Sequence, residues 1–293
     1  MKVTNQTLTS FKNKWDKNQS LAFAETQREG SEIFNWVLNR NGLSSVNDLR
    51  EWLSKKTSIL DAGCGNGRIT ALLSKYSQPS AVITGIDLTS SDVAKKNLVD
   101  YKNIKIAKKD LLENLSDLGN FDLIYCQEVL HHTSDPKAAF LNLCKLLKKH
   151  GEIAIYVYKQ KAPMREYADD YVRDRVSDLE YEEAIDVMKG ITELGKILSE
   201  LDVKINVPEI KVLGIKSGEY DIQRFIYNYF LKCFWNNSLD YNENVAINYD
   251  WYHPQLCTRH TLEEIINWYD DAELEIIHSC VDDYGITVRG IKQ

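Results

Sequence analysis

Short apolar runs and longer segments with helical periodicity follow each other along the first half of the chain. An apolar run at 57–60 ends in Asp61, glycines occupy 63, 65 and 67, and an apolar-periodic stretch starting at Arg68 predicts a helix. Further strands are predicted at 81–86, 104–107, 121–126 and 151–158, with a helix over 136–149 before the last of them. Strands that alternate with helices predict an α/β fold with a parallel sheet.

Helical patterns also flank this alternation on both sides. Ser31 and Thr261 precede two of them as N-cap residues, and Glu264 three residues after Thr261 predicts a capping box. Two apolar runs near the C-terminus predict a closing antiparallel hairpin. The predicted helices are 31–39, 46–53, 91–99, 181–201 and 262–272, and the hairpin strands are 274–281 and 285–291.

The glycine turn after the first strand is the leading candidate for ligand binding. A strand, a glycine turn and a helix together present backbone N–H groups and a helix N-terminus to a ligand. A dinucleotide site needs a third glycine where Arg68 stands, and a phosphate loop needs Lys followed by Ser or Thr after its last glycine. The sequence carries an acid followed by G-x-G-x-G; the alternative is a turn with a structural role alone.

This motif resembles the first motif of the class I S-adenosylmethionine (SAM) methyltransferases. Similar later motifs stand at matching distances: Asp87 ends the second strand, Asp110 follows the third, and QEVLHHTSDP from Gln127 follows the fourth. The resemblance covers about 57–158 and resumes at about 261–293. It implies a Rossmann-like, seven-stranded, mostly parallel sheet with an antiparallel last strand. It also implies SAM as cofactor and S-adenosylhomocysteine (SAH) as product.

The resemblance further implies which core residues bind the cofactor. The glycine turn passes the amino-acid end and ribose of SAM, and the acid that ends the second strand accepts the ribose hydroxyls. The acid after the third strand binds the adenine amino group while its neighbour packs on the ring. The implied cofactor residues of the core are Asp61, Gly63, Cys64, Gly65, Asp87, Leu88, Asp110, Leu111 and Gln127.

Residues 1–56 precede the first strand and are predicted to form a helical lid. N-terminal helices of this family close over SAM, so Phe11, Trp15 and Arg28 are lid candidates, with ordinary packing as the alternative. The charge of Arg28 suits the methionine carboxylate, and we predict that Trp15 and Arg28 contact the cofactor.

About a hundred residues, 159–260, intervene where the family expects one helix and the final hairpin. They hold thirteen Lys and Arg against eighteen Asp and Glu, and they are rich in tyrosine. The segment is predicted to be mainly helical over 181–201, irregular over 206–214 and an aromatic helix over 220–235. We expect it to cap the carboxyl ends of the strands, where open α/β sheets bind ligands. The candidate substrate-binding residues are Arg165, Arg224, Tyr252 and Arg259, whose cations suit a phosphate or carboxylate.

Transfer to a hydroxyl group requires a base, and three histidines are candidates. His131 and His132 follow the fourth strand at the ligand-binding edge of the sheet, while His253 belongs to the inserted segment. Only one of His131 and His132 can point at the ligand, and His132 could instead fix the following loop. An amine acceptor would need no strong base.

The composition of the chain limits the classes of substrate and partner that it could bind. A net charge of −7 disfavours a nucleic-acid substrate, which requires a basic footprint. Six scattered cysteines without a C-x-x-C pair favour buried thiols in a reducing cytoplasm over disulfides, and no metal-ligand spacing is visible. The sequence has no run of eighteen apolar residues, so we expect no membrane span.

These observations predict four segments and one activity. The segments are the lid 1–56, the SAM-binding core 57–158, the insertion 159–260 and the closing helix and hairpin 261–293. The predicted activity is SAM-dependent O-methylation of a small polar metabolite, most plausibly a sugar or a nucleotide-linked hydroxyl. The alternatives are N- or C-methylation of a specialised metabolite, methylation of tRNA or protein, and a non-catalytic SAM-binding module.

Overall fold

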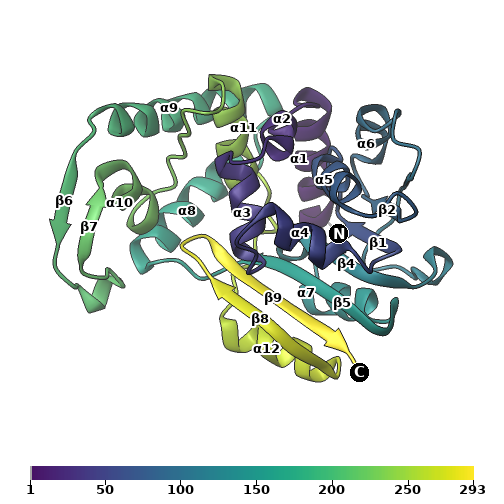
Figure 1. The fold of residues 1–293 in the computed structure, drawn as a ribbon. Coiled ribbons are helices and arrows are strands. Elements are labelled where there is room, and N and C mark those ends of the chain that lie inside the picture. The colour runs from purple at the N-terminus through teal and green to yellow at the C-terminus, as the bar shows by residue number, and fades with distance from the viewer. Residues whose placement is uncertain (1) are drawn as a thin grey trace. The chain divides into compact units, whose positions relative to one another are not determined.

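The computed structural model describes residues 2–293, and the chain divides into two compact units (Figure 1). The core unit consists of Trp15–Lys159 and Thr258–Gln293. The insertion unit consists of the chain up to Lys14 together with Gln160–Cys257. Residues 2–14 therefore group with the insertion rather than with the rest of the predicted N-terminal lid. No helix of residues 2–293 is both long and apolar enough to cross a membrane.

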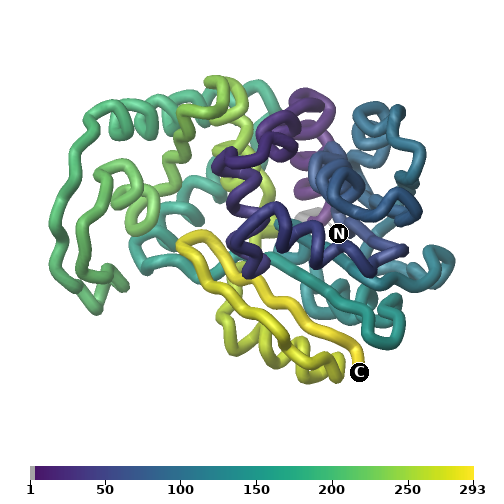
Figure 2. Tube along the Cα trace, viewed as in Figure 1, coloured from purple at the N-terminus to yellow at the C-terminus, as the bar shows by residue number. Residues whose placement is uncertain are grey.

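A seven-stranded sheet organises the core unit, in the order β3-β2-β1-β4-β5-β9-β8. The first five strands in this order are parallel, and β9 pairs antiparallel with both β5 and β8. In Figure 2 the yellow C-terminal trace returns beside β5. The strands are β1 Ser58–Ala62, β2 Val82–Ile86, β3 Ile104–Ala107, β4 Phe121–Gln127, β5 Leu147–Tyr158, β8 Leu274–Val281 and β9 Gly285–Lys292. The predicted fold class is confirmed.

Helices cover both faces of this sheet because neighbouring strand residues point to opposite sides. Ile59 packs in the cluster that contains Phe34, whereas Leu60 packs in the cluster that contains Phe140. The helices on the Ile59 side are α3 Glu32–Arg40, α4 Val46–Leu53 and α5 Arg68–Tyr76; those on the Leu60 side are α7 Pro136–Cys144 and α12 Leu262–Asp271. The core unit also contains α2 Phe23–Gln27 and α6 Ser91–Asn97.

Hydrogen bonds at the N-caps confirm the predicted starts of the helices after Ser31 and Thr261, but two other predictions about helices are wrong. The Ser31 and Thr261 side chains accept the N–H groups of residues three positions later. The Glu264 carboxylate, however, bonds to His260. The prediction of a helix over 136–149 is wrong, because α7 ends at Cys144. Leu147 already pairs with Phe121 in the sheet, so the following lysines belong to β5.

The insertion unit combines helices with a small sheet. Its elements are α8 Pro163–Val176, α9 Tyr181–Glu200, β6 Lys204–Val207, β7 Gly218–Asp221, α10 Ile222–Tyr229, α11 Tyr241–Tyr252 and most of α1 Lys2–Lys17. The predicted helix 181–201 is confirmed. Residues 206–214 are not wholly irregular, because β6 and β7 form an antiparallel pair. The aromatic helix predicted over 220–235 spans only α10.

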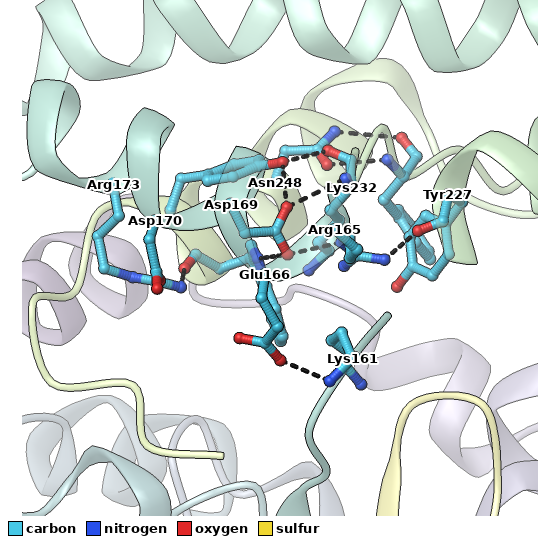
Figure 3. Close-up of polar contacts among 12 residues, drawn as sticks. Lys161, Arg165, Glu166, Asp169, Asp170, Arg173, Tyr227, Lys232 and Asn248 are labelled. Atoms are coloured by element: carbon cyan, nitrogen blue, oxygen red, sulfur yellow. Dashed lines mark hydrogen bonds and ion pairs between the residues drawn. The ribbon is translucent and has the colours of Figure 1, made fainter. Parts of the chain in front are cut away.

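One buried carboxylate joins the helices of the insertion unit (Figure 3). Asp169 accepts hydrogen bonds from Arg165 Nε at 2.5 Å, Trp251 Nε1 at 2.8 Å and the Tyr252 hydroxyl at 2.9 Å. Asp169 and Arg165 are each only 1% exposed. A buried carboxylate is tolerated when it is paired and hydrogen-bonded, and here those partners come from α8 and α11.

We predict that Asp169→Asn strongly destabilises the insertion unit. The variant leaves Arg165 buried without its counter-charge, a loss that typically costs about 3–5 kcal/mol of unfolding free energy. The matched control is Asp174→Asn on the same helix, because the Asp174 side chain is exposed and such a surface substitution should cost less than about 0.5 kcal/mol. Thermal and urea unfolding of both variants measures the difference. Equal effects would contradict the structural role of Asp169.

Candidate cofactor and acceptor site

The glycine turn between β1 and α5 leaves no room for side chains at two of its positions. Gly63 has φ +84°, and a Cβ there would lie 2.2 Å from Val129 Cγ2. Gly65 has φ +55°, and a Cβ there would lie 2.8 Å from the Trp15 ring. Both backbone conformations favour glycine, and both contacts forbid even alanine without movement. The turn therefore brings Trp15, predicted as a cofactor residue, and the end of β4 together.

Hydrogen bonds attach this turn to the end of β2. The N–H groups of Gly63 and Cys64 donate to the Ile86 carbonyl at 2.7 and 2.9 Å. Asp87 Oδ2 accepts the N–H of Gly65 at 3.0 Å. Segments that are 22 or 23 residues apart in sequence thus form one backbone surface at the carboxyl ends of β1 and β2.

The Asp87 carboxylate is partly used by its own loop. Oδ1 accepts from the Thr89 N–H at 2.8 Å, the Thr89 hydroxyl at 3.1 Å and the Ser90 N–H at 2.8 Å. These three donors fill Oδ1, whereas Oδ2 has one hydrogen-bond partner among residues 2–293 and keeps acceptor capacity. A ribose hydroxyl that binds here would therefore donate to Oδ2 rather than to both carboxylate oxygens.

Asp61 lies below this surface and is only 3% exposed. Burial is the largest cause that raises the pKa of Asp61 to about 7, and the nearby Asp87 charge adds to the rise. A hydrogen bond from the Thr70 hydroxyl, at 2.5 Å from Asp61 Oδ2, and the charge of Arg68 oppose it. The structure thus places Asp61 as a support beneath the turn rather than as an exposed ligand group.

The other predicted cofactor residues of the core lie at the carboxyl ends of the strands or just after them. Gln127 is half-buried and its side-chain oxygen accepts the Tyr125 hydroxyl, while Asp110 accepts the Leu112 N–H at 2.9 Å. Cys64 and Leu111 are buried among apolar side chains, and Leu88 is half-buried. Arg28 is more than half exposed and pairs with Glu25.

Sequence reasoning missed an ion-pair network beside the turn. Glu128 directly follows β4 with φ +61°, a left-handed conformation that is uncommon for residues other than glycine. Its carboxylate lies 3.2 Å from Arg40 Nη1 and 3.9 Å from Arg68 Nη2, and Arg40 Nε also contacts Asp282 Oδ2 at 3.0 Å. The network joins α3, α5, the end of β4 and the β8–β9 turn. No local spacing in the sequence links these residues.

The three candidate bases have different surroundings. His131 is fully buried, with its ring centroid 3.7 Å from that of Tyr158. His132 is half-buried at the same edge of the sheet. His253 belongs to the insertion unit, where its ring nitrogens lie 2.7 Å from Ser10 Oγ and 3.0 Å from the Leu179 carbonyl, and burial lowers its pKa. Of the two predicted bases in the core, His132 has the more accessible ring.

The candidate substrate residues are divided between the two units. Arg165 and Tyr252 are buried in the Asp169 cluster, so their polar groups stabilise the insertion unit, which corrects their predicted role. Arg224 also lies in the insertion unit, with its guanidinium 5.6 Å from the Tyr227 ring centroid. Arg259 lies in the core unit and is half-buried.

Comparison with known proteins identifies a methyltransferase domain in this chain. A family model described as a methyltransferase domain matches residues 53–200, about half of the chain. A ubiquinone biosynthesis O-methyltransferase of Coxiella burnetii is 34% identical over 102 residues, which are 34% of this chain and 42% of the relative. The protein of the same name from Pasteurella multocida is 33% identical over 131 residues, which are 40% of this chain and 52% of that relative. The chain thus spans about half the length of these curated relatives.

A solved structure with a similar fold is that of an O-methyltransferase family protein from Burkholderia thailandensis. It is 14% identical in sequence and has a TM-score of 0.48. The alignment covers 99% of this chain and 72% of the other.

We predict that Asp87→Ala weakens SAH binding at least tenfold, which corresponds to about 1.4 kcal/mol. The variant removes the acceptor oxygen and also releases the Gly65 N–H and the loop after β2. Asp92→Ala, on an almost fully exposed side chain of α6, is the matched control. Isothermal titration calorimetry measures both. An unchanged dissociation constant for Asp87→Ala would show that the ligand lies elsewhere.

A second prediction concerns the pH dependence of stability. Folded Asp61 holds its proton up to about pH 7, whereas an unfolded aspartate loses it near pH 4, at about 3.9. The folded state therefore binds more protons between these values, and this residue's contribution to stability falls as pH rises from 4 to 7. Asp61→Asn should gain about 2 kcal/mol over the wild type between pH 5 and pH 7. Parallel pH profiles of urea unfolding for the two proteins would refute this.

Proposed function

The chain belongs to the SAM-dependent methyltransferase family, and on this premise we propose that it methylates a hydroxyl group of a small polar metabolite. A sugar or a nucleotide-linked hydroxyl is the proposed acceptor. The observation that carries the proposal is the glycine turn hydrogen-bonded to Asp87 at the carboxyl ends of β1 and β2.

The shape of the turn supports a nucleoside cofactor. Gly63 and Gly65 bring the backbone to the site without a Cβ, and Asp87 Oδ2 keeps acceptor capacity for a ribose hydroxyl. The residue after the third glycine is Arg68, so a pyrophosphate fingerprint is absent from the sequence. SAM supplies an electrophilic methyl group on a sulfonium.

Oxygen as the acceptor atom is supported by the relatives and by the residues at the sheet edge. The curated relatives named above are O-methyltransferases. Imidazoles follow β4 at the carboxyl edge, where a base could take the hydroxyl proton. An amine acceptor would not require such groups.

A small acceptor is supported by the charge of the chain. The net charge of −7 and the acidic insertion would repel the phosphate backbone of tRNA. In the proposed reaction the core residues hold the cofactor, exclude water and align the acceptor oxygen with the bond that breaks, so positioning supplies much of the rate.

We expect the purified chain to form SAH from SAM when it is given a hydroxyl acceptor. The panel contains UDP-glucose, simple catechols, primary amines and unfractionated tRNA, and mass spectrometry identifies the methylated product. Asp87→Ala should lower SAH formation with every acceptor, since it acts through the cofactor. Methylation of amines or tRNA alone would overturn the proposed acceptor class, and saturable SAH binding without any transfer would favour a non-catalytic module.

A further inference from the structure

Two hydrogen bonds in series connect three side chains of the core unit that the sequence did not single out for catalysis. Glu264 Oε1 lies 2.9 Å from His260 Nδ1, and His260 Nε2 lies 2.9 Å from Thr258 Oγ1. His260 is 5% exposed and its ring meets Trp268 edge to face. The acid, imidazole and hydroxyl thus form one continuous hydrogen-bonded line, which we call the 258–264 relay.

The relay lies at the ligand-binding edge of the sheet. The backbone N–H of His260 donates to the carbonyl of Tyr158 at 2.9 Å, and Tyr158 is the last residue of β5. The Thr258 N–H donates to the His131 carbonyl at 2.9 Å, just beyond the end of β4. Thr258 and His260 therefore lie beside the carboxyl ends of β4 and β5, the edge at which parallel sheets bind ligands.

The relay can accept one proton without leaving any of its polar groups unsatisfied. In the state in which Glu264 is ionised and His260 is neutral, Glu264 only accepts, so His260 would carry its proton on Nδ1 and Nε2 would accept from the Thr258 hydroxyl. When Nε2 also gains a proton, it donates to Thr258 Oγ1. The Thr258 hydroxyl can then turn to the His131 carbonyl, 3.2 Å away. The Glu264 charge compensates the imidazolium in this state.

We propose that the 258–264 relay removes the proton of the acceptor hydroxyl, with Thr258 Oγ as the atom that the acceptor contacts. The proposal rests on the O-methyl transfer proposed above. As the acceptor oxygen bonds to the methyl carbon, the carbon–sulfur bond breaks and its electron pair remains on sulfur. The acceptor proton passes to Thr258 Oγ while the proton of Thr258 passes to His260 Nε2. The sulfonium charge is lost and the imidazolium charge appears, so total charge is conserved.

The three histidines predicted as bases fit this role less well. His131 is fully buried against Tyr158, and His253 belongs to the insertion unit with its ring nitrogens held by Ser10 and Leu179. His132 is the rival, because it is half-buried at the same edge. In the relay the Glu264 carboxylate orients the His260 ring, and the Glu264 side chain is 45% exposed, which gives the proton a route to solvent.

The first test reads the tautomer of His260 in the full chain saturated with SAH. Imidazole nitrogen chemical shifts distinguish the Nδ1–H tautomer from the Nε2–H tautomer, and the His260 signal is assigned by its loss in His260→Gln. We expect the Nδ1–H form in the wild type, loss of its dominance in Glu264→Ala, and no change in Glu263→Ala, an exposed neighbour in the same helical turn. An Nε2–H tautomer in the wild type would overturn the relay.

The second test measures the pH profile of methyl transfer to the hydroxyl acceptor that reacts fastest in the panel. His260→Gln and Thr258→Val should each lower kcat about a hundredfold and remove the acidic limb of the profile, while Thr258→Ser restores it. A purely structural role would lower the melting temperature and leave the shape of the profile unchanged. An unchanged profile in His260→Gln together with a lost limb in His132→Ala would assign the base to His132.

The two proposals fail in different ways. If the wild-type chain binds SAH but methylates no hydroxyl in the panel, the proposed function is wrong, and the relay proposal falls with it. If the wild type methylates a hydroxyl and His260→Gln does so with the same pH dependence, only the relay is overturned.

Discussion

The carboxyl edge of the core sheet depends on close packing at the β1–α5 turn, where two glycines leave space for neighbouring side chains. Val129 and the Trp15 ring occupy the space that side chains at positions 63 and 65 would need. The turn can therefore contact the residues after β4 and, through Gly65 and Asp87, the residues after β2. A methyl group at either glycine would push these segments apart and remove the surface on which a nucleoside could lie.

The two units contain buried carboxylates with different surroundings. In the insertion unit, Asp169 is deeply buried and its charge is compensated by Arg165 and by aromatic donors, which fixes α8 against α11. In the core, burial raises the pKa of Asp61 to about 7, and the hydrogen bond from the Thr70 hydroxyl offsets only part of that rise. The pairing of Asp169 stabilises the fold of the insertion unit, whereas the burial of Asp61 leaves a titratable group beneath the glycine turn.

The carboxyl edge of the sheet collects groups that lie far apart along the chain. Glu128 after β4 is held by Arg40 and Arg68, and the His131 carbonyl is held by Thr258. These contacts bring segments before β1, after β4 and after the insertion to one edge. The positions of these groups are set by ion pairs and backbone hydrogen bonds between distant segments rather than by sequence neighbours.

The sequence by itself determined the order of strands and helices, the glycine turn and the acid at Asp87, because these depend on local periodicity and on backbone conformations that only certain residues adopt. It also located His131 and His132 correctly at the end of β4. Only the tertiary structure decided that helix α7 stops at Cys144, that Arg165 and Tyr252 are buried around Asp169, and that Thr258, His260 and Glu264 are hydrogen-bonded in line. Those outcomes depend on which distant strand or helix supplies the partner, and burial by that partner decides whether a charged side chain faces a ligand or the interior.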